Sequence, residues 1–213
     1  MLDFVPAAPI LLAYVLAVVA LVLTPGPDMT LFLGKAVSQS RMAGVAAMLG
    51  NSLGLVIHTV LVAIGLAALL AASVTAFTVL KVVGAAYLAF LAYQAIRYGS
   101  ALTLGGKRTT APLYRVFLHG LTVNLLNPKI IVFFVTFLPQ FVTPGDPHAS
   151  GKLMFLGLMF VAISIPMSLP MIYFAGSIAG FLKRSPKATR AVDYLFATVL
   201  GGFAVRLILA QAK

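Results

Sequence analysis

The chain has 213 residues, of which 62% are hydrophobic and 9% are charged, and its formal net charge is +11. This composition excludes an ordinary soluble domain and predicts an all-α integral membrane protein. The sequence has no cysteine, which excludes disulfides, thiol redox chemistry and thiolate metal sites, and we expect no cofactor.

The first apolar segment extends from about residue 9 to residue 34, and the motif Thr24-Pro25-Gly26-Pro27-Asp28 interrupts it. No Lys or Arg precedes this segment, which argues against a cleavable signal peptide and predicts that the segment remains as the first membrane span. The stretch between Arg41 and Arg97 contains a single charge. Because one crossing needs about 20 apolar residues, this stretch predicts two spans with a turn at residues 72–75.

Residues 98–112 are glycine-rich, polar and basic, and they predict a cytoplasmic linker between two halves, residues 1–97 and 113–213. The fourth span is expected to run from about residue 113 to residue 142. The motif Asn127-Pro128-Lys129 interrupts it, much as the earlier proline motif interrupts the first span. The sequence therefore predicts two broken helices, one in each half.

A turn signal at residues 143–147 precedes the fifth apolar segment. That segment, residues 153–182, is uncharged, and Pro166 and Pro170 are expected to kink it. A sixth span is expected over residues 192–210. We therefore predict six transmembrane helices.

Six spans separate the basic residues onto one side of the membrane. That side would carry Lys35, Arg41, Arg97, Lys107, Arg108, Arg115, Lys183, Arg184, Lys187 and Arg190. The opposite side would carry fewer basic residues, together with Asp3 and Asp146. By the positive-inside rule the first side is cytoplasmic, so we expect a multi-pass protein of the bacterial inner membrane with both termini in the periplasm.

The two interruptions share one pattern. Each has a capping-type residue, then proline at the first helical position, then a charge: Gly26-Pro27-Asp28 and Asn127-Pro128-Lys129. Proline lacks an N–H and frees the carbonyl four residues earlier, which here are those of Leu21, Leu23 and Asn124. Bare backbone at membrane depth is tolerated only where it is buried in protein or lines a wet cavity. Both breaks are therefore expected to face a polar interior.

Three spans in each half, joined by a linker, must run in opposite directions. This arrangement predicts two inverted three-helix repeats of the kind found in secondary transporters. A shift of 101 residues aligns Pro27-Asp28 with Pro128-Lys129, Phe32 with Phe133 and Gln39 with Gln140. The two breaks would then face each other near the middle of the bilayer.

The breaks offer complementary charges to a zwitterion. Half-helix N-termini and Lys129 suit a carboxylate, and Asp28 suits an ammonium group. The predicted substrate-binding residues are Pro25, Gly26, Pro27, Asp28, Asn124, Asn127, Pro128 and Lys129. Asp28 and His58 are the candidates for carrying a coupled proton, and Thr24, Asn51, Ser52 and Gln140 are candidates for additional polar lining.

Structural interpretations compete with these assignments. Asp28 and Lys129 could form an ion pair that locks the two halves, and His58 could be a core histidine bonded to a neighbouring helix. The patterns Gly50-x-x-x-Gly54 and Gly176-x-x-x-Gly180 are compatible with a homodimer face, although close packing within one subunit is the favoured interpretation.

The stretches that carry this chemistry also carry a family resemblance. Leu23-Thr-Pro-Gly-Pro-Asp28, Gly84-Ala-Ala-Tyr-Leu88, and Asn124-Leu-Leu-Asn-Pro-Lys129 with the following Phe133-Phe134 and Phe137-Leu-Pro-Gln-Phe141 resemble the LysE/RhtB family of amino-acid exporters, and more closely its homoserine/threonine-type branch. The resemblance implies a six-span inner-membrane protein that exports amino acids or their derivatives and is driven by the proton gradient.

We therefore expect a secondary transporter that exports a small amino acid by proton antiport, with membrane lipid and no nucleic acid among its partners. A metal-cation exporter is the alternative transporter, but four acidic residues and no cysteine provide few ligands. An intramembrane enzyme is disfavoured because no H-E-x-x-H or paired-acid motif occurs. A non-transporting assembly or lipid-binding protein is the remaining alternative.

Overall fold

The computed structural model describes residues 6, 8–66, 74–98, 110–142 and 146–209. Residues 72 and 73 of the predicted turn, most of the predicted linker at 98–112 and residues 143–145 lie outside this part, as does Asp3. The described first half contains α1 (Ala8–Leu23), α2 (Pro27–Ser38), α3 (Arg41–Leu61) with a π-helical continuation, η1 (Val62–Leu66), and α5 (Val74–Tyr98).

The described second half is also helical throughout. It contains α6 (Leu113–Leu125), α7 (Pro128–Val132), the π-helical turn η2 (Phe133–Phe137), the 3-10 turn η3 (Leu138–Phe141), α8 (Ala149–Tyr173), α9 (Ala175–Arg184) and α10 (Pro186–Leu209). The change of winding in η2 and η3 occurs where Pro139 has no N–H to give to the carbonyl four residues earlier. The predicted all-α class is thus confirmed for the described residues.

Among the described residues, at most four of the six predicted membrane spans are found by length and composition. Arg41–Gly65 and Ala149–Tyr173 are long and apolar enough to cross a bilayer alone. Two bent pairs qualify together: Leu11–Leu23 with Pro27–Ser38, bent by 50°, and Leu113–Leu125 with Pro128–Phe141, bent by 49°. The predicted interruptions of the first and fourth segments are confirmed.

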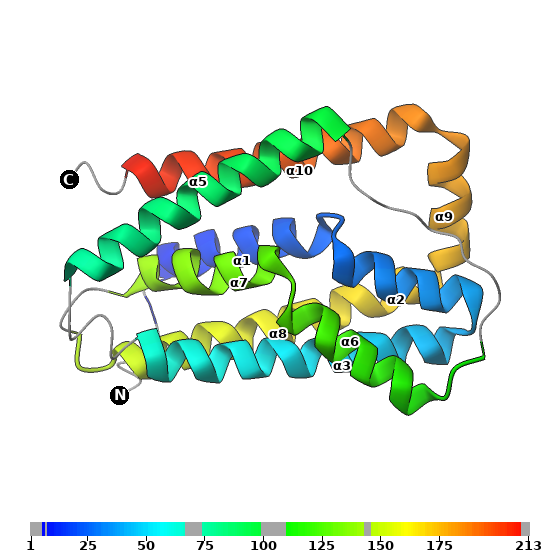
Figure 1. Ribbon diagram of the computed structural model, residues 1–213, viewed down its shortest axis with the longest axis horizontal. Helices are drawn as coiled ribbons and strands as arrows, with labels where there is room; N and C mark the ends of the chain where they lie inside the picture. The colour runs from blue at the N-terminus through cyan, green and yellow to red at the C-terminus, as the bar shows by residue number, and fades with distance from the viewer. Residues whose placement is uncertain (1–5, 7, 67–73, 99–109, 143–145, 210–213) are drawn as a thin grey trace.

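The fifth segment differs from the prediction. It was expected to continue to residue 182, but α8 ends at Tyr173 and α9 turns across the end of the bundle (Figure 1). Because α8 has 25 residues and a helix rises about 1.5 Å per residue, α8 is already longer than a core of about 30 Å. Pro166 and Pro170 lie inside α8, which is unbroken at both.

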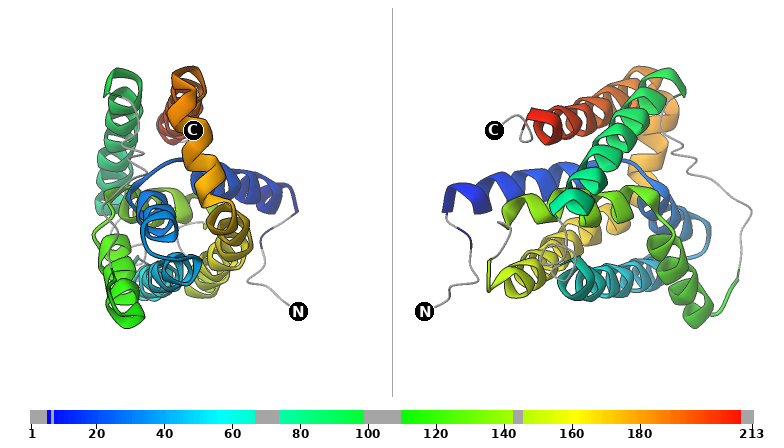
Figure 2. Two further views of the ribbon diagram at one scale, coloured as in Figure 1. Left: turned by 90° about the vertical axis from the view of Figure 1, so that its right-hand side faces the viewer. Right: turned by 60° about the vertical axis from the view of Figure 1, so that its left-hand side comes forward.

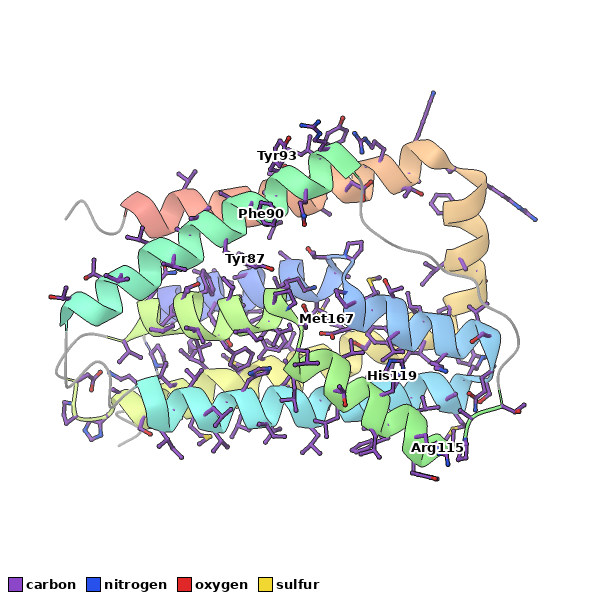
Figure 3. All side chains as sticks on the ribbon, viewed as in Figure 1. Tyr87, Phe90, Tyr93, Arg115, His119 and Met167 are labelled. Carbon is purple, nitrogen blue, oxygen red and sulfur yellow. The ribbon has the colours of Figure 1, made fainter. Side chains whose placement is uncertain are left out.

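The long helices run along one axis of the molecule and form layers (Figures 1 and 2). Helices α5 and α10 lie side by side at one face, with α1 and α7 beneath them, and α3, α6 and α8 at the opposite face. Figure 3 shows Tyr87 of α5 directed inwards and Tyr93 on the outer side of the same helix. Gly84, one turn before Tyr87, allows α5 to approach Thr136, whose side chain a Cβ would meet at 1.9 Å.

Two separate apolar clusters fill the bundle. One is built around Tyr14 of α1 and the aromatic rings of η2, and the other around Phe32 of α2 and Met48 of α3. Along four of the chain segments, the residues between these clusters are polar and buried. They are Thr24 and Asp28, Ser52, Asn124, Asn127 and Lys129, and Ser164 and Ser168. A polar layer therefore separates two hydrophobic cores.

Glycines bring α3 and α6 into backbone contact. A Cβ on Gly50 would lie 1.9 Å from the Phe117 carbonyl oxygen, and one on Gly120 would lie 2.1 Å from the Ala47 carbonyl oxygen. The first glycine pattern is thus used within the subunit, as favoured. Gly176 and Gly180 of α9 show no such packing against the part of the chain that the structure describes, because a Cβ at either position would meet none of it within 4 Å.

Candidate functional site

The first break is closed by a lysine from the other half of the chain. Lys129 Nζ donates hydrogen bonds to the carbonyl oxygens of Thr24 at 3.2 Å and Leu21 at 3.4 Å. Leu21 is the residue whose carbonyl Pro25 frees. Gly26 leaves space for the ammonium group, since a Cβ there would lie 2.9 Å from Nζ. Lys129 therefore satisfies backbone that the proline leaves bare.

The second break is closed by a histidine from the first half. His58 Nε2 lies 3.4 Å from the Asn124 carbonyl oxygen, which Pro128 frees. The His58 ring also packs against Phe134, with 5.7 Å between ring centroids. Asn127 caps the helix that follows, because its Oδ1 accepts from the Lys129 N–H at 3.0 Å. Each break is thus stabilised by a side chain from the opposite half.

Asp28 lies in a buried cluster with two asparagines. Asn124 Nδ2 donates to Asp28 Oδ2 at 3.1 Å and contacts Asn51 Oδ1 at 2.6 Å. Among the described residues, Asn124 Oδ1 is buried with no hydrogen-bond partner. The Asn127 Nδ2 atom is also buried, and it lies toward Asp28 without full hydrogen-bond geometry to any described residue. The cluster brings together α2, α3 and both sides of the second break.

Asp28 and Lys129 are both in the interior, with 8% and 7% of their surface exposed. Within the part of the chain that the structure describes, the two side chains interact electrostatically but form no ion pair. The locking ion pair is therefore not formed in this structure. An acidic and a basic side chain are therefore buried at the two breaks without being paired.

Other predicted site residues make local contacts. Ser52 donates to the Met48 carbonyl at 2.9 Å, and Gln140 donates to the Thr136 carbonyl at 3.2 Å, each within its own helical segment. Thr24 Oγ1 likewise donates to the Ala20 carbonyl at 2.7 Å. Pro25 is buried at the first break, whereas Pro27 and Pro128 are exposed at the first positions of their helices. These prolines shape backbone, and the structure brings neither Ser52 nor Gln140 to Asp28.

Sequence reasoning missed polar residues of α8. Ser164 and Ser168 are 7% and 5% exposed and lie one helical turn apart, at the level of the polar layer. Tyr14 was missed as well: its hydroxyl donates to the Leu156 carbonyl at 2.7 Å and joins α1 to α8. The spacing of the two serines in an otherwise apolar segment was the available signal. Among the described residues, no group of three or more His, Asp or Glu side chains could hold a metal ion.

Comparison with known proteins shows which proteins this chain resembles. Residues 19–211 match the LysE type translocator family. The chain is 33% identical over 201 residues to the homoserine/homoserine lactone efflux protein of Salmonella typhimurium, covering 94% of this chain and 96% of that protein. It is also 33% identical to an uncharacterized membrane protein of Vibrio cholerae, covering 94% and 97%, and 28% identical to the membrane protein YrhP of Bacillus subtilis, covering 92% and 97%. No solved structure matches the chain.

Proposed function

Because the chain belongs to the LysE type translocator family, we propose that it is an inner-membrane secondary transporter that exports homoserine, its lactone or a similar amino-acid derivative. Relatives that share most of its length are homoserine/homoserine lactone efflux proteins. They are transporters rather than enzymes, and the resemblance seen in the sequence is confirmed at the level of the family.

The proposed topology has six spans in two inverted repeats, residues 1–97 and 113–213. The layout of the ends supports it: α2, α5 and α8 end, and α6 and α10 begin, at one end of the bundle in Figure 1. Arg115 lies at this end in Figure 3, and Arg41 and Arg97 occupy the helix ends that meet there. This end is cytoplasmic, so both termini are periplasmic.

One observation carries the proposed binding mode: an acidic and a basic side chain, Asp28 and Lys129, are buried at two facing helix breaks and form no ion pair with each other. Buried charges within a membrane protein usually mark a pathway. The substrate carboxylate meets Lys129 and the half-helix N-termini, and the substrate ammonium meets Asp28. A lactone has no carboxylate, so the ammonium group is what the two named substrates of the relatives share.

Export is coupled to proton entry in this proposal. A proton taken up from the periplasm, on Asp28 or His58, resets the site after the amino acid leaves. Both side chains are close to the second break: Asp28 through Asn124 Nδ2 and His58 through the Asn124 carbonyl. A proton on either side chain would therefore lie beside the proposed substrate site.

Proteoliposomes test this function. Vesicles loaded with labelled homoserine should release it faster when the outside is acidified, and an ionophore that collapses the pH gradient should remove the acceleration. Release that is the same with and without protein would overturn the transport proposal. Acceleration by acid that persists in Asp28→Asn/His58→Ala would overturn the coupling assignment alone.

The homodimer remains a separate proposal. Gly50 and Gly54 pack against α6 of the same subunit, so they do not serve a dimer face. Gly176 and Gly180 of α9 remain the candidates. Cysteines introduced at these positions into the cysteine-free chain should cross-link between subunits in membranes if the dimer forms there.

A further inference from the structure

We infer that Asp28 holds a proton when the site is empty, with Asn51 and Asn124 as positioning residues. This inference rests on the proposed function for its role in coupling, but the protonated carboxyl itself is a property of the resting protein. It assigns the proton to Asp28 rather than to His58. Three polar atoms that all contact one another support this assignment.

The three atoms form a closed triangle. Asn124 Nδ2 is 3.1 Å from Asp28 Oδ2 and 2.6 Å from the amide oxygen of Asn51. The same Asn51 atom is 3.0 Å from Asp28 Oδ2 and 3.1 Å from Asp28 Oδ1. Every side of the triangle is therefore at hydrogen-bonding distance, and each needs one donor and one acceptor.

An ionised Asp28 cannot satisfy this triangle. A carboxylate only accepts hydrogen bonds, so both amides would have to present nitrogen to it. The two nitrogens, of Asn51 and Asn124, would then face each other at 2.6 Å with no acceptor between them. If either amide instead presents oxygen, that oxygen lies against the carboxylate at 3.0 or 3.1 Å. All orientations of the amides leave at least one side of the triangle repulsive.

A protonated Asp28 satisfies all three sides at once. Its O–H donates to Asn51 Oδ1, its Oδ2 accepts from Asn124 Nδ2, and the same Nδ2 donates its second hydrogen to Asn51 Oδ1. Rotating both amides together also works, because the O–H then donates to Asn124. A neutral acid is both donor and acceptor, and this dual character is what a ring with an odd number of members requires.

Two titratable groups interact electrostatically with Asp28, and each has another hydrogen-bond partner. They are Lys129 at the second break and His58 of α3. The Lys129 ammonium is bonded to the backbone of the first break rather than to Asp28. His58 Nε2 donates to the Asn124 carbonyl, which a neutral imidazole can do, so the histidine needs no extra proton.

The substrate can take the place of the proton. An ammonium group carries three N–H donors and can donate to the ionised Asp28 where the O–H donated before. Asp28 then binds either a proton or the substrate amine, and not both. Such competition for one carboxyl produces exchange of one for the other without a second titratable site.

Infrared spectroscopy of the purified full-length protein tests the inference. A protonated side-chain carboxyl has a C=O stretching band above the amide I region, and the chain has only four acidic residues, all aspartate. Near neutral pH we expect this band in the wild-type protein, a shift when the aspartate carboxyl is labelled with ¹³C, and its loss in Asp28→Asn. The labelled wild-type protein gives a reading even if the variant fails to fold.

Matched variants assign the band to Asp28 and to its contact with Asn51. Asp193→Asn removes another buried carboxyl, of a residue that is 3% exposed, and should leave the band in place. Asn51→Ala should weaken the band because it removes the acceptor, whereas Ser52→Ala, which removes a buried hydroxyl bonded to its own helix, should not. A band that is absent from the wild type, or that survives in Asp28→Asn, would overturn the inference.

The two proposals can fail separately. Addition of homoserine should diminish the band if the substrate displaces the proton. A band that Asp28→Asn removes, in a protein that exports no amino acid in vesicles, would leave the proton site standing and overturn the proposed function. Export that requires the pH gradient, in a protein without the band, would support the proposed function and overturn the proton site.

Discussion

The two helix breaks have nearly the same backbone and different chemistry. Their bends are 50° and 49°, and in both the capping residue accepts the first helical hydrogen bond, Thr30 to Gly26 and Ile131 to Asn127. At the first break, however, the freed Leu21 carbonyl accepts a hydrogen bond from Lys129. At the second break, the freed Asn124 carbonyl accepts one from His58.

This difference shows which break can respond to a ligand. A substrate carboxylate competes with the Leu21 and Thr24 carbonyls for the Lys129 ammonium, because all three are acceptors. The imidazole at the second break contacts the Asn124 carbonyl and the Phe134 ring. Binding is therefore expected to loosen the first break and leave the second intact.

Replacement of Lys129 should have the largest effect. Lys129→Met removes the proposed partner of the substrate carboxylate, and since a hydrogen bond to a charged group contributes about 1.5–3 kcal/mol, homoserine efflux should fall about 10- to 100-fold. Efflux of homoserine lactone should fall much less, since the lactone has no carboxylate. Initial rates from loaded vesicles measure both, with Lys187→Met as the control at an exposed lysine.

Equal loss of homoserine and lactone efflux in Lys129→Met would contradict the expectation that the first break responds to the substrate carboxylate. It would mean that the lysine holds the fold of the first break and does not select the substrate. Retention of the same thermal unfolding midpoint in both lysine variants would show that the loss is one of transport.

A methyl group added at each break should sharpen the difference in rigidity. At Gly54 a Cβ would lie 2.4 Å from Asn124 Oδ1 and 2.9 Å from Asn124 Cβ, so Gly54→Ala must displace a side chain held on both sides. Overpacking of this kind costs about 1–3 kcal/mol. At Gly26 the Cβ would meet the far end of the long Lys129 side chain, so Gly26→Ala should lower the unfolding midpoint less. If Gly26→Ala lowers the unfolding midpoint more than Gly54→Ala does, the first break is the more rigid of the two, which would contradict this expectation.

Replacement of His58 should have a modest effect. His58→Phe removes one long hydrogen bond, of 3.4 Å, and a neutral hydrogen bond contributes about 0.5–1.5 kcal/mol. Homoserine efflux should therefore fall by less than about tenfold, and its acceleration by an acidic exterior should remain. Loss of that acceleration in His58→Phe, with a retained rate in the absence of a gradient, would transfer the coupling role to the histidine.

The smallest effect is expected far from both breaks. A hydrogen bond from Lys152, and a second from the His148 N–H, hold the pKa of the Asp146 carboxyl below its usual value. A depressed pKa stabilises the fold above the unfolded pKa, and this contribution is lost as the pH falls through the folded one. Asp146→Asn should therefore slightly lower the unfolding midpoint at neutral pH and leave it unchanged in strong acid. Homoserine efflux should not change.

The sequence was sufficient for the breaks because proline acts locally. Pro25, Pro27 and Pro128 fix where hydrogen bonds must fail, whatever the tertiary structure, and the carbonyls of Leu21 and Asn124 were predictable from them. The partners of those carbonyls depend on contacts between distant segments, so Lys129 and His58 could be proposed only as charges or polar groups near the site.

Other features depend on the third dimension. Asn51 and Ser52 are adjacent in sequence, but their side chains point differently. The Asn51 amide faces Asp28, whereas the Ser52 hydroxyl bonds to the Met48 carbonyl of its own helix. The end of α8 at Tyr173 was missed because the apolar composition continues past this residue. The chain changes direction there after 25 helical residues, a length that already exceeds the thickness of the bilayer core. Ser164 and Ser168 were missed because two hydroxyls in an apolar run form no motif by themselves.

The glycine contacts between α3 and α6 restrict how such a protein can move. Gly50 packs against the Phe117 carbonyl and Gly120 packs against the Ala47 carbonyl. Because the backbones of the two helices are in contact at both points, the helices cannot slide along each other unless they first separate. Whatever opens the molecule first to one face of the bilayer and then to the other must carry this pair as a single block, so the hinges have to be sought elsewhere in the bundle.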